Sequence, residues 1–195
     1  MRAVAAVAAA AAVLRGLSRT AARMSDPVLY FAYGSNMWTP RMHICNGTAT
    51  FHDVGKLEGF SLAFVGHAEA WCGAVATVVD CPTASVCGVV WAVPQEDIHR
   101  LHAQESEYSS HEVMVQLSSG AVAKCHTYWY GADVPEQRPS LAYKAVLVAG
   151  ALEHGLPQEY VGRLLAIPDN GCTRGVTIKV DMDALRSCLG GHLTL

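Results

Sequence analysis

The chain has 195 residues and a net charge of −3, with 51% hydrophobic and 16% charged residues. The sparse charge and the lack of a basic run argue against nucleic acid as a partner. No apolar stretch reaches the roughly 18 residues of a membrane-spanning helix, so we expect no membrane partner either.

The N-terminal segment differs in composition from the rest of the chain. Residues 1–24 are rich in alanine and contain four arginines but no acidic residue. Three of these arginines are spaced four apart, which would place them on one helix face, as in a mitochondrial transit peptide. A disordered translated leader, with the working start at Met24, explains the segment equally well. We therefore expect a leader over residues 1–27, a single domain over 28–188 and a tail over 189–195.

The seven cysteines favour a reducing compartment. Their number is odd and no two show a C-x-x-C spacing, whereas disulfide frameworks in short secreted chains usually hold even counts. We expect reduced thiols that mostly pack as small hydrophobic side chains.

The first structured elements are predicted before residue 50. Val28–Tyr33 is a short apolar and aromatic run that predicts a buried strand, and it stops at three turn-forming residues, Gly34, Ser35 and Asn36. Thr39-Pro40 then predicts a short helix, with threonine as N-cap and proline at the first helical position. The helix is expected to end near Asn46-Gly47.

A series of short strands follows and indicates the fold class. The expected strands are Thr48–Val54, Gly59–Val65, Gly73–Val79 and Val86–Val93, then His111–Leu117 and Ala121–Tyr130 after an intervening helix. Amphipathic helices are expected over Ser140–His154 and Pro157–Ile167. This pattern predicts an α+β fold, in which a small mixed, mostly antiparallel sheet curls into a barrel with helices around it.

The helix predicted from Pro94 onward brings a carboxylate inward. Ile98, Leu101 and Glu105 are spaced i, i+3 and i+7, so they share the core-facing side, with Glu105 at or just past the helix end. Loss of hydration there would raise the pKa of Glu105 toward values useful for proton transfer. The alternative is a glutamate at a helix end that swings out to solvent.

A second candidate for chemistry is the turn Tyr33-Gly34-Ser35-Asn36. Consecutive N–H groups in such a turn can hold a carboxylate or a developing oxyanion. From these four residues alone, an ordinary strand-to-helix turn is the better interpretation.

The histidines give little support for a metal. His99, His102 and Glu105 are three apart, but successive i+3 steps spread the side chains around the helix, so they would converge poorly on one ion. We therefore predict no metal and two surface histidines. Tyr128 and Tyr143, taken singly, are more typical of core aromatics with a satisfied hydroxyl.

Several segments in order resemble one known family. Phe31-Ala32-Tyr33-Gly34-Ser35-Asn36-Met37 resembles the signature of the γ-glutamylcyclotransferases. The later segments that match in order are Trp71–Thr77, Gly88–Trp91, Gln104-Glu105, Tyr143-Lys144 and Gly155-Leu156-Pro157. The resemblance covers roughly residues 28 to 185 with spacing largely preserved.

The resemblance carries expectations about activity and site. It implies a curled β-barrel enzyme that converts a γ-glutamyl amino acid into 5-oxoproline and a free amino acid, without a cofactor. It implies a homodimer in the cytoplasm, or in mitochondria if the leader is a transit peptide. By position, Glu105 matches the family's acid/base glutamate. The expected substrate-binding residues are Tyr33, Gly34, Ser35, Asn36, Met37, Tyr128 and Tyr143.

Some positions bear on the class within the family. Asn36 favours the dipeptide-acting enzymes, because glutathione-specific relatives tend to have a hydrophobic residue there and γ-glutamylamine cyclotransferases a Tyr-Gly-Thr type turn. Two positions depart from the family pattern. Ser106 stands where a glycine usually follows the catalytic glutamate, and Glu112 stands where the family has a tyrosine, although Tyr108 lies close in sequence. A sister cyclotransferase, or a non-catalytic binding protein on the same fold, therefore stays open.

Overall fold

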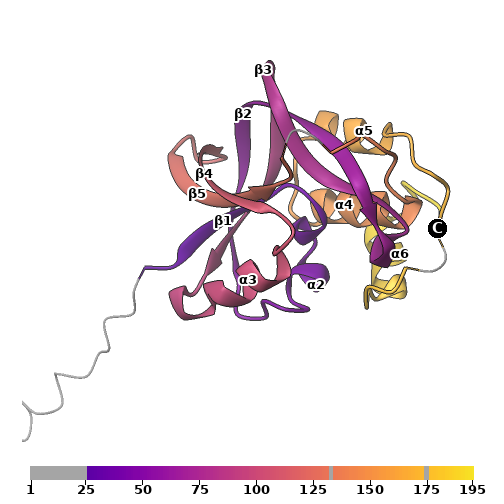
Figure 1. Cartoon of the computed structure of the whole chain (residues 1–195), viewed down its shortest axis with the longest axis horizontal. Coiled ribbons are helices and arrows are strands. Elements are labelled where there is room, and N and C mark those ends of the chain that lie inside the picture. The colour runs from indigo at the N-terminus through magenta and orange to yellow at the C-terminus, as the bar shows by residue number, and fades with distance from the viewer. Residues whose placement is uncertain (1–25, 132–133, 174–175) are drawn as a thin grey trace, which may run out of the picture.

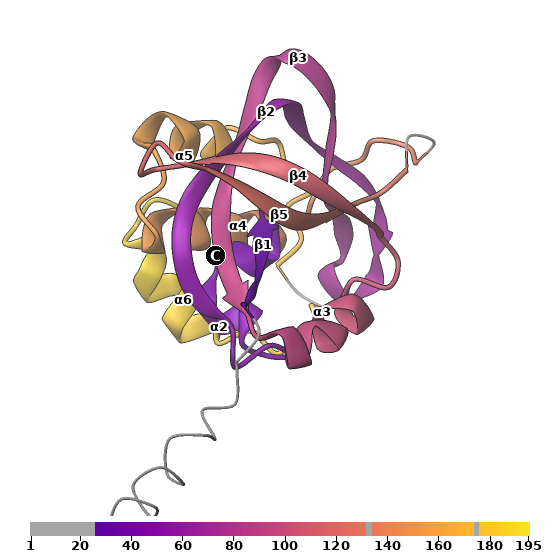
Figure 2. The ribbon, with the colours of Figure 1, turned by 90° about the vertical axis from the view of Figure 1, so that its left-hand side faces the viewer.

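The computed structural model of the chain describes residues 26–131, 134–173 and 176–195. The leader predicted over residues 1–27 thus lies almost entirely outside the described residues. Five strands form a closed barrel, shown in Figures 1 and 2, in the order β1-β3-β2-β4-β5. They are β1 (Val28–Ala32), β2 (Thr50–Ala68), β3 (Gly73–Val93), β4 (Ser109–Leu117) and β5 (Val122–Trp129).

Strand directions confirm the predicted mixed barrel. Neighbouring strands are antiparallel except for β1 and β5, which meet in parallel at Tyr30 and His126. Alternate side chains of β1, β3 and β5 fill the interior; Phe31, Val90 and Cys125 have no exposed surface. The α+β barrel with surrounding helices is therefore the observed fold.

Two strands are longer than predicted. Residues that were expected to break the sheet instead lie within it, so four predicted strands become β2 and β3. At the break near Gly59, which has a φ of +82°, the pairing jumps from Glu58–Ser85 to Phe60–Asp80. The turn-forming residues therefore form a β-bulge in β2 and a stretch of unpaired residues in β3, and the pairing of the two strands continues on both sides.

The helices follow the predicted order but differ in extent and burial. The helical segments are η1 (Ser35–Met37), α2 (Thr39–Met42), η2 (Glu69–Trp71), η3 (Gln95–Asp97), α3 (Ile98–Gln104), α4 (Leu141–Glu153), α5 (Gln158–Leu165) and α6 (Met182–Leu189). Helices α4, α5 and α6 gather on one side of the barrel, whereas α3 lies at its lower end (Figures 1 and 2). Among the described residues, no helix is long and apolar enough to cross a membrane.

Helix α4 is a central element rather than an amphipathic surface helix. Residues 142–151 are all buried, so the prediction of an amphipathic helix over Ser140–His154 is wrong. The other helices and the barrel cover it on every side, and a helix buried all round has no polar face. Ser140 caps its start, because its side chain accepts a hydrogen bond from the Tyr143 amide at 3.0 Å.

A close approach joins α4 to the turn after β1. A Cβ atom added to Gly150 would lie 2.6 Å from the carbonyl carbon of Met37 and from the nitrogen of Trp38. Only glycine therefore lets α4 pack against η1, which fixes the position of the turn.

The C-terminal segment also belongs to the packed core. Leu185 and Leu189 of α6 are buried, and Leu193 and Leu195 pack against the core while partly exposed. The core thus continues past residue 188, where the sequence places the end of the domain. Of the seven cysteines only Cys87 and Cys125 are buried, so the prediction that most of them pack as small hydrophobic side chains is wrong.

Candidate active site

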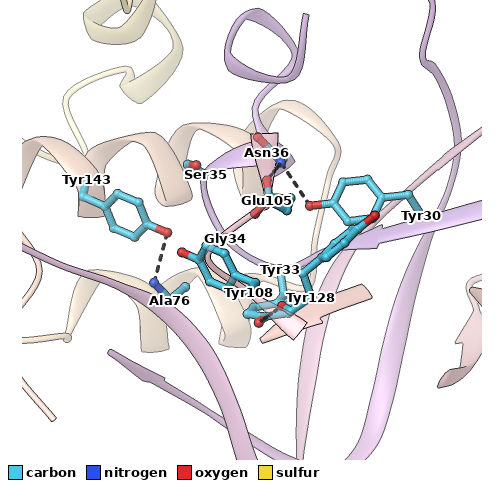
Figure 3. A pocket seen from close by; sticks show the side chains of 10 residues that line it. All are labelled: Tyr30, Tyr33, Gly34, Ser35, Asn36, Ala76, Glu105, Tyr108, Tyr128 and Tyr143. Atoms are coloured by element: carbon cyan, nitrogen blue, oxygen red, sulfur yellow. Dashed lines mark hydrogen bonds between the residues drawn. The ribbon is translucent and has the colours of Figure 1, made fainter. Parts of the chain in front are cut away.

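A small pocket brings together the turn after β1, the end of α3 and residues of β1, β3, β5 and α4. It encloses about 40 Å³ and contains five tyrosines (Figure 3). It is lined by Tyr30, Tyr33, Gly34, Ser35, Asn36, Ala76, Glu105, Tyr108, Tyr128 and Tyr143. A water molecule needs roughly 10–15 Å³ by this measure, so the pocket has room for about three water-sized groups.

The turn owes its glycine to a close approach. Gly34 has φ −110° and ψ −145°, so it does not occupy the left-handed region. A Cβ atom on it, however, would lie 3.1 Å from the Tyr143 hydroxyl oxygen and 3.3 Å from the Ala76 Cβ. Glycine therefore allows the backbone of the turn to run beside Tyr143.

Met37 lies outside the pocket, unlike the rest of its predicted set. Its side chain is fully buried, and its N–H donates to the Gly34 carbonyl at 3.0 Å. It packs behind the turn, close to Gly150 of α4. Met37 thus anchors the turn from the core side, which differs from the predicted contact with substrate. The other predicted residues, Tyr33 to Asn36 and Tyr128 and Tyr143, all line the pocket.

Glu105 reaches the pocket from the end of α3. The helix ends at Gln104, and the Glu105 N–H still donates to the Leu101 carbonyl at 3.0 Å while its own backbone leaves the helix. Leu101 is fully buried on the same face. The i, i+4 relation between these two residues turns the glutamate inward, as their spacing in the sequence predicts.

The two oxygens of the Glu105 carboxylate are held unequally. Oε1 accepts a hydrogen bond from Nδ2 of Asn36 at 2.9 Å (Figure 3). It also accepts one from Nε2 of Gln104, likewise at 2.9 Å. Within the described part of the chain, no donor is bonded to Oε2. The protein therefore holds one carboxylate oxygen with two side-chain amides, and the two oxygens of Glu105 differ in their hydrogen bonding.

Burial raises the pKa of Glu105 above the ordinary glutamate value. The hydrogen bonds from Gln104 and Asn36 and the charge of Arg41 act in the opposite direction but do not cancel it. The residue as a whole is partly exposed because it ends a helix, yet its carboxylate lies in the pocket, and the desolvation of that group decides the direction.

Some tyrosine hydroxyls of the pocket already donate a hydrogen bond within the protein, whereas others only accept one. Tyr33 donates its proton to the Tyr128 carbonyl. The Tyr143 hydroxyl accepts from the Ala76 N–H at 3.1 Å, and that of Tyr30 accepts from Asn36 Nδ2 at 3.0 Å, so both keep their own protons to donate. Burial raises the pKa of Tyr143 to about 12, which keeps this hydroxyl protonated at neutral pH.

The histidines of α3 are engaged in contacts other than metal binding. His102 Nδ1 lies 2.8 Å from the Tyr128 hydroxyl, and His99 Nδ1 lies 2.8 Å from the Glu96 carbonyl. Among the described residues, no group of three or more His, Cys, Asp or Glu side chains could hold a metal ion.

Sequence reasoning missed part of the pocket. The sequence places Tyr30 and Ala76 in strands, and Ala76 also lies in the family-matching segment Trp71–Thr77, but neither position carries a local signal of a pocket residue. Tyr108 was considered only as a replacement for a family tyrosine, and it lines the pocket with its ring 4.3 Å from that of Tyr130.

Comparison with curated proteins identifies the family. A Mus musculus protein named Gamma-glutamylcyclotransferase is 37% identical over 158 residues, which cover 77% of this chain and 84% of that protein. The Homo sapiens protein of the same name is 35% identical over 164 residues, covering 80% of this chain and 87% of that one. The chain belongs to the γ-glutamylcyclotransferase family.

Structural similarity extends over the whole of a solved member. A structure titled "Gamma-glutamyl cyclotransferase" superposes with a TM-score of 0.76 at 33% identity, covering 85% of this chain and 100% of that one. The AIG2-like family matches residues 85–164, a range that includes Glu105 and the whole of α4.

The positions that depart from the γ-glutamylcyclotransferase pattern do not open the pocket. Glu112 lies on β4 with an exposed side chain, 2.7 Å from Lys124, whose hydrogen bond and charge lower the pKa of that carboxyl. Ser106 is exposed and lines no part of the pocket. Tyr108 supplies an aromatic wall three residues after Glu105.

Proposed function

We propose that the chain is a γ-glutamylcyclotransferase that converts γ-glutamyl amino acids into 5-oxoproline and a free amino acid. In this reaction the α-amine of the substrate attacks its own γ-carbonyl, with Glu105 as general acid and base. The observation that carries the proposal is the Glu105 carboxylate, which presents one unclaimed oxygen to a small pocket beside the turn Gly34–Asn36. Family membership supports the same reaction.

The Glu105 carboxylate is suited to the two proton transfers that the reaction requires. The α-amine is protonated near neutral pH and must lose a proton before it attacks, and the leaving amine must gain one. Oε2 of Glu105 takes the first proton and later returns it, while Oε1 stays bound to Asn36 and Gln104. The raised pKa of Glu105 makes it a stronger base than an exposed glutamate.

The remaining pocket groups would bind the substrate and the oxyanion. The Tyr143 hydroxyl can donate to an oxygen in the pocket because its lone pair already accepts from Ala76. The amides of Gly34, Ser35 and Asn36 form the turn beside it, whereas that of Met37 is used within the turn. A preorganised donor of this kind stabilises a developing oxyanion by about 3 kcal/mol.

The small pocket suits a reaction in which the attacking amine and the attacked carbonyl belong to the same molecule. With room for about three water-sized groups, the cavity is too small to enclose a whole γ-glutamyl group, so we place the reacting γ-carbonyl and α-amine inside and the rest of the substrate at the mouth. Orientation of an intramolecular attack supplies several kcal/mol without a cofactor or a covalent intermediate. We therefore propose no resident cofactor.

We also propose a homodimer in the cytoplasm, on the resemblance to the family. Size-exclusion chromatography with light scattering on residues 24–195 tests the assembly, and a monomer at micromolar concentration would contradict it.

The activity is tested by measuring 5-oxoproline. Protein spanning residues 24–195 is incubated in parallel with γ-glutamyl-alanine, glutathione and γ-glutamyl-lysine, with Glu105→Gln as the matched control. We expect product from the dipeptide and a loss of at least about 100-fold in the variant, since the base is replaced by a group of the same shape. Near-wild-type turnover by Glu105→Gln would refute the role of this residue.

The other substrates separate the remaining alternatives. Product mainly from glutathione, or from γ-glutamyl-lysine, would keep the chemistry and assign the chain to a sister class. A folded protein that binds but turns over none of the three would be a binding protein on the same fold.

A further inference from the structure

A chain of three side-chain amides leads from the protein interior to Glu105. Asn46 donates from Nδ2 to Oε1 of Gln104 at 3.0 Å. Gln104 donates from Nε2 to Oδ1 of Asn36 and to Oε1 of Glu105, both at 2.9 Å. Asn36 in turn donates from Nδ2 to Oε1 of Glu105. We call these three residues the amide relay.

The hydrogen bonds of the amide relay all run in one direction, with the N–H groups pointing toward Glu105, and Asn46 at the start of the relay sets this direction. An amide can offer two N–H groups on one side only if its oxygen points the other way. The oxygen of Gln104 is occupied by Asn46, so its N–H groups face Asn36 and Glu105. The oxygen of Asn36 is occupied by Gln104, so its N–H groups face Glu105 and Tyr30.

Asn46 is placed to hold that direction. Only 1% of the residue is exposed, and it lies in the loop between α2 and β2, outside the pocket. Its N–H donates to the Met42 carbonyl at 3.2 Å, and its carbonyl accepts from the Ala49 N–H at 3.0 Å. Its side-chain Oδ1 has no partner among the described residues. The Nδ2 bond to Gln104 is thus the contact that orients its side chain.

We propose that Asn46 is a positioning residue for the catalysed reaction, which acts through Gln104 to keep two N–H groups directed at Oε1 of Glu105. The inference rests on the proposed role of Glu105 in proton transfer. Without Asn46 the oxygen of Gln104 loses its donor, and the terminal amide of Gln104 is free to turn away from the carboxylate. That arrangement removes one donor from the charged form of Glu105 and favours the protonated form.

Other groups face the same carboxylate and stay unchanged in the test. The cation is Arg41 of α2, and the neutral hydroxyls belong to Tyr30, Tyr33, Tyr108, Tyr128, Tyr130 and Tyr143. Each tyrosine has a raised pKa and remains protonated through the acid range. The acid-range titration at this position therefore reports Glu105.

The experiment is a ¹³C NMR titration of protein labelled at the glutamate side-chain carboxyl, with the resonance of Glu105 assigned by its loss in Glu105→Gln. In Asn46→Ala we expect the pKa of Glu105 to rise by roughly one unit, about the effect of one hydrogen bond to a charged group. The acid limb of the kcat/KM profile should move by the same amount. In a Gln104→Met background, Asn46→Ala should add no further shift.

A matched control separates positioning from general support of the loop. Thr48 lies in the same loop and ties it to Asp97 through a 2.7 Å hydrogen bond, and among the described residues its side chain makes no hydrogen bond to the relay. Thr48→Ala should leave the pKa of Glu105 unchanged. Should Asn46→Ala fail to fold, Asn46→Ser, which is too short to reach Gln104, replaces it with the same expectation.

An unchanged pKa of Glu105 in the folded Asn46 variant would overturn the proposal, as would additive shifts in the double variant. The titration needs no turnover, so it is independent of the proposed activity. If Glu105→Gln is inactive and the pKa of Glu105 is the same in Asn46→Ala as in the wild type, only this inference fails. If the pKa shifts but Glu105→Gln stays active, the proposed role of Glu105 fails, and Asn46 then orients a carboxylate that takes no part in the reaction.

Discussion

Adding one methyl group at Gly34 tests whether the backbone of the turn packs directly against Tyr143. The new Cβ would lie 3.1 Å from the Tyr143 hydroxyl oxygen and 3.3 Å from the Ala76 Cβ. Neither neighbour yields easily: both are buried, and the hydroxyl is bonded to the Ala76 amide. Because φ at Gly34 is −110°, Gly34→Ala carries no left-handed strain, and its effect is steric.

The expected magnitude follows from a displacement of a few tenths of an ångström. Overpacking costs about 1–3 kcal/mol, and the lower entropy of the unfolded chain offsets about 0.4–1 kcal/mol of that. We therefore expect the free energy of unfolding to fall by about 1 kcal/mol. A misplacement of about 1 Å costs roughly 100-fold in rate, so the smaller shift should lower kcat/KM about tenfold.

The assay compares Gly34→Ala with Gly162→Ala in α5. Gly162 is exposed, and a Cβ on it would meet no atom within 4 Å, so its replacement should leave 5-oxoproline formation unchanged and stabilise the helix by about 0.5–1 kcal/mol. If Gly34→Ala retains kcat/KM within twofold and an unchanged Tm, the turn does not press against Tyr143, and the described pocket geometry is wrong.

Three further predictions concern charge and hydrogen bonding. Because burial raises the pKa of Glu105, its basic form is lost as pH falls through a value above that of ordinary glutamate; an acid limb of kcat/KM at or below the ordinary value contradicts this. Tyr143→Phe leaves the Ala76 N–H without its acceptor and should lower kcat about 10–100-fold, whereas a change in KM alone would assign Tyr143 to binding. Asp169→Asn should destabilise the fold by about 3 kcal/mol, since it leaves the buried Lys144 ammonium without the carboxylate 2.7 Å away. The hydrogen bond from Lys144 lowers the pKa of Asp169. The stabilisation by this ion pair is therefore present above the pKa that Asp169 has in the unfolded chain, and it is lost as pH falls through the pKa of the folded protein. The prediction is refuted if urea denaturation shows the same loss of unfolding free energy in Asp169→Asn at pH 7 and well below the folded pKa.

The sequence predicts those parts of the site that depend on local spacing. Glu105 follows Leu101 by one helical turn, so its inward direction can be derived without tertiary information. The turn at Gly34 is also predicted, from its turn-forming residues, but the reason that only glycine fits there is not: it is the close approach of Tyr143, more than 100 positions away. Contacts of that kind leave no local pattern.

The fold shows the same division between local and distant causes. The order and approximate positions of the strands and of helices α2 to α5 follow from hydrophobic runs and turn residues, whereas the merging of four predicted strands into β2 and β3 does not. Gly59 has the composition of a chain break, but the long pairing of the two strands turns it into a bulge. The polar residues of α4 predict an amphipathic helix, but Lys144 is buried, because its ammonium group is bound by Asp169 and by two backbone carbonyls.

Asn36 connects the turn Gly34–Asn36 to Glu105, the proposed acid/base residue. Its backbone carbonyl accepts a hydrogen bond from Trp91 Nε1 at 2.9 Å, so β3 fixes the turn. Its side chain binds Glu105 Oε1 at 2.9 Å, so the same residue fixes the carboxylate relative to that turn. A change that displaces the turn must therefore also displace or release Glu105. For this reason a steric change at Gly34 should alter the pH dependence as well as the rate, whereas a change confined to substrate contacts would alter the rate alone.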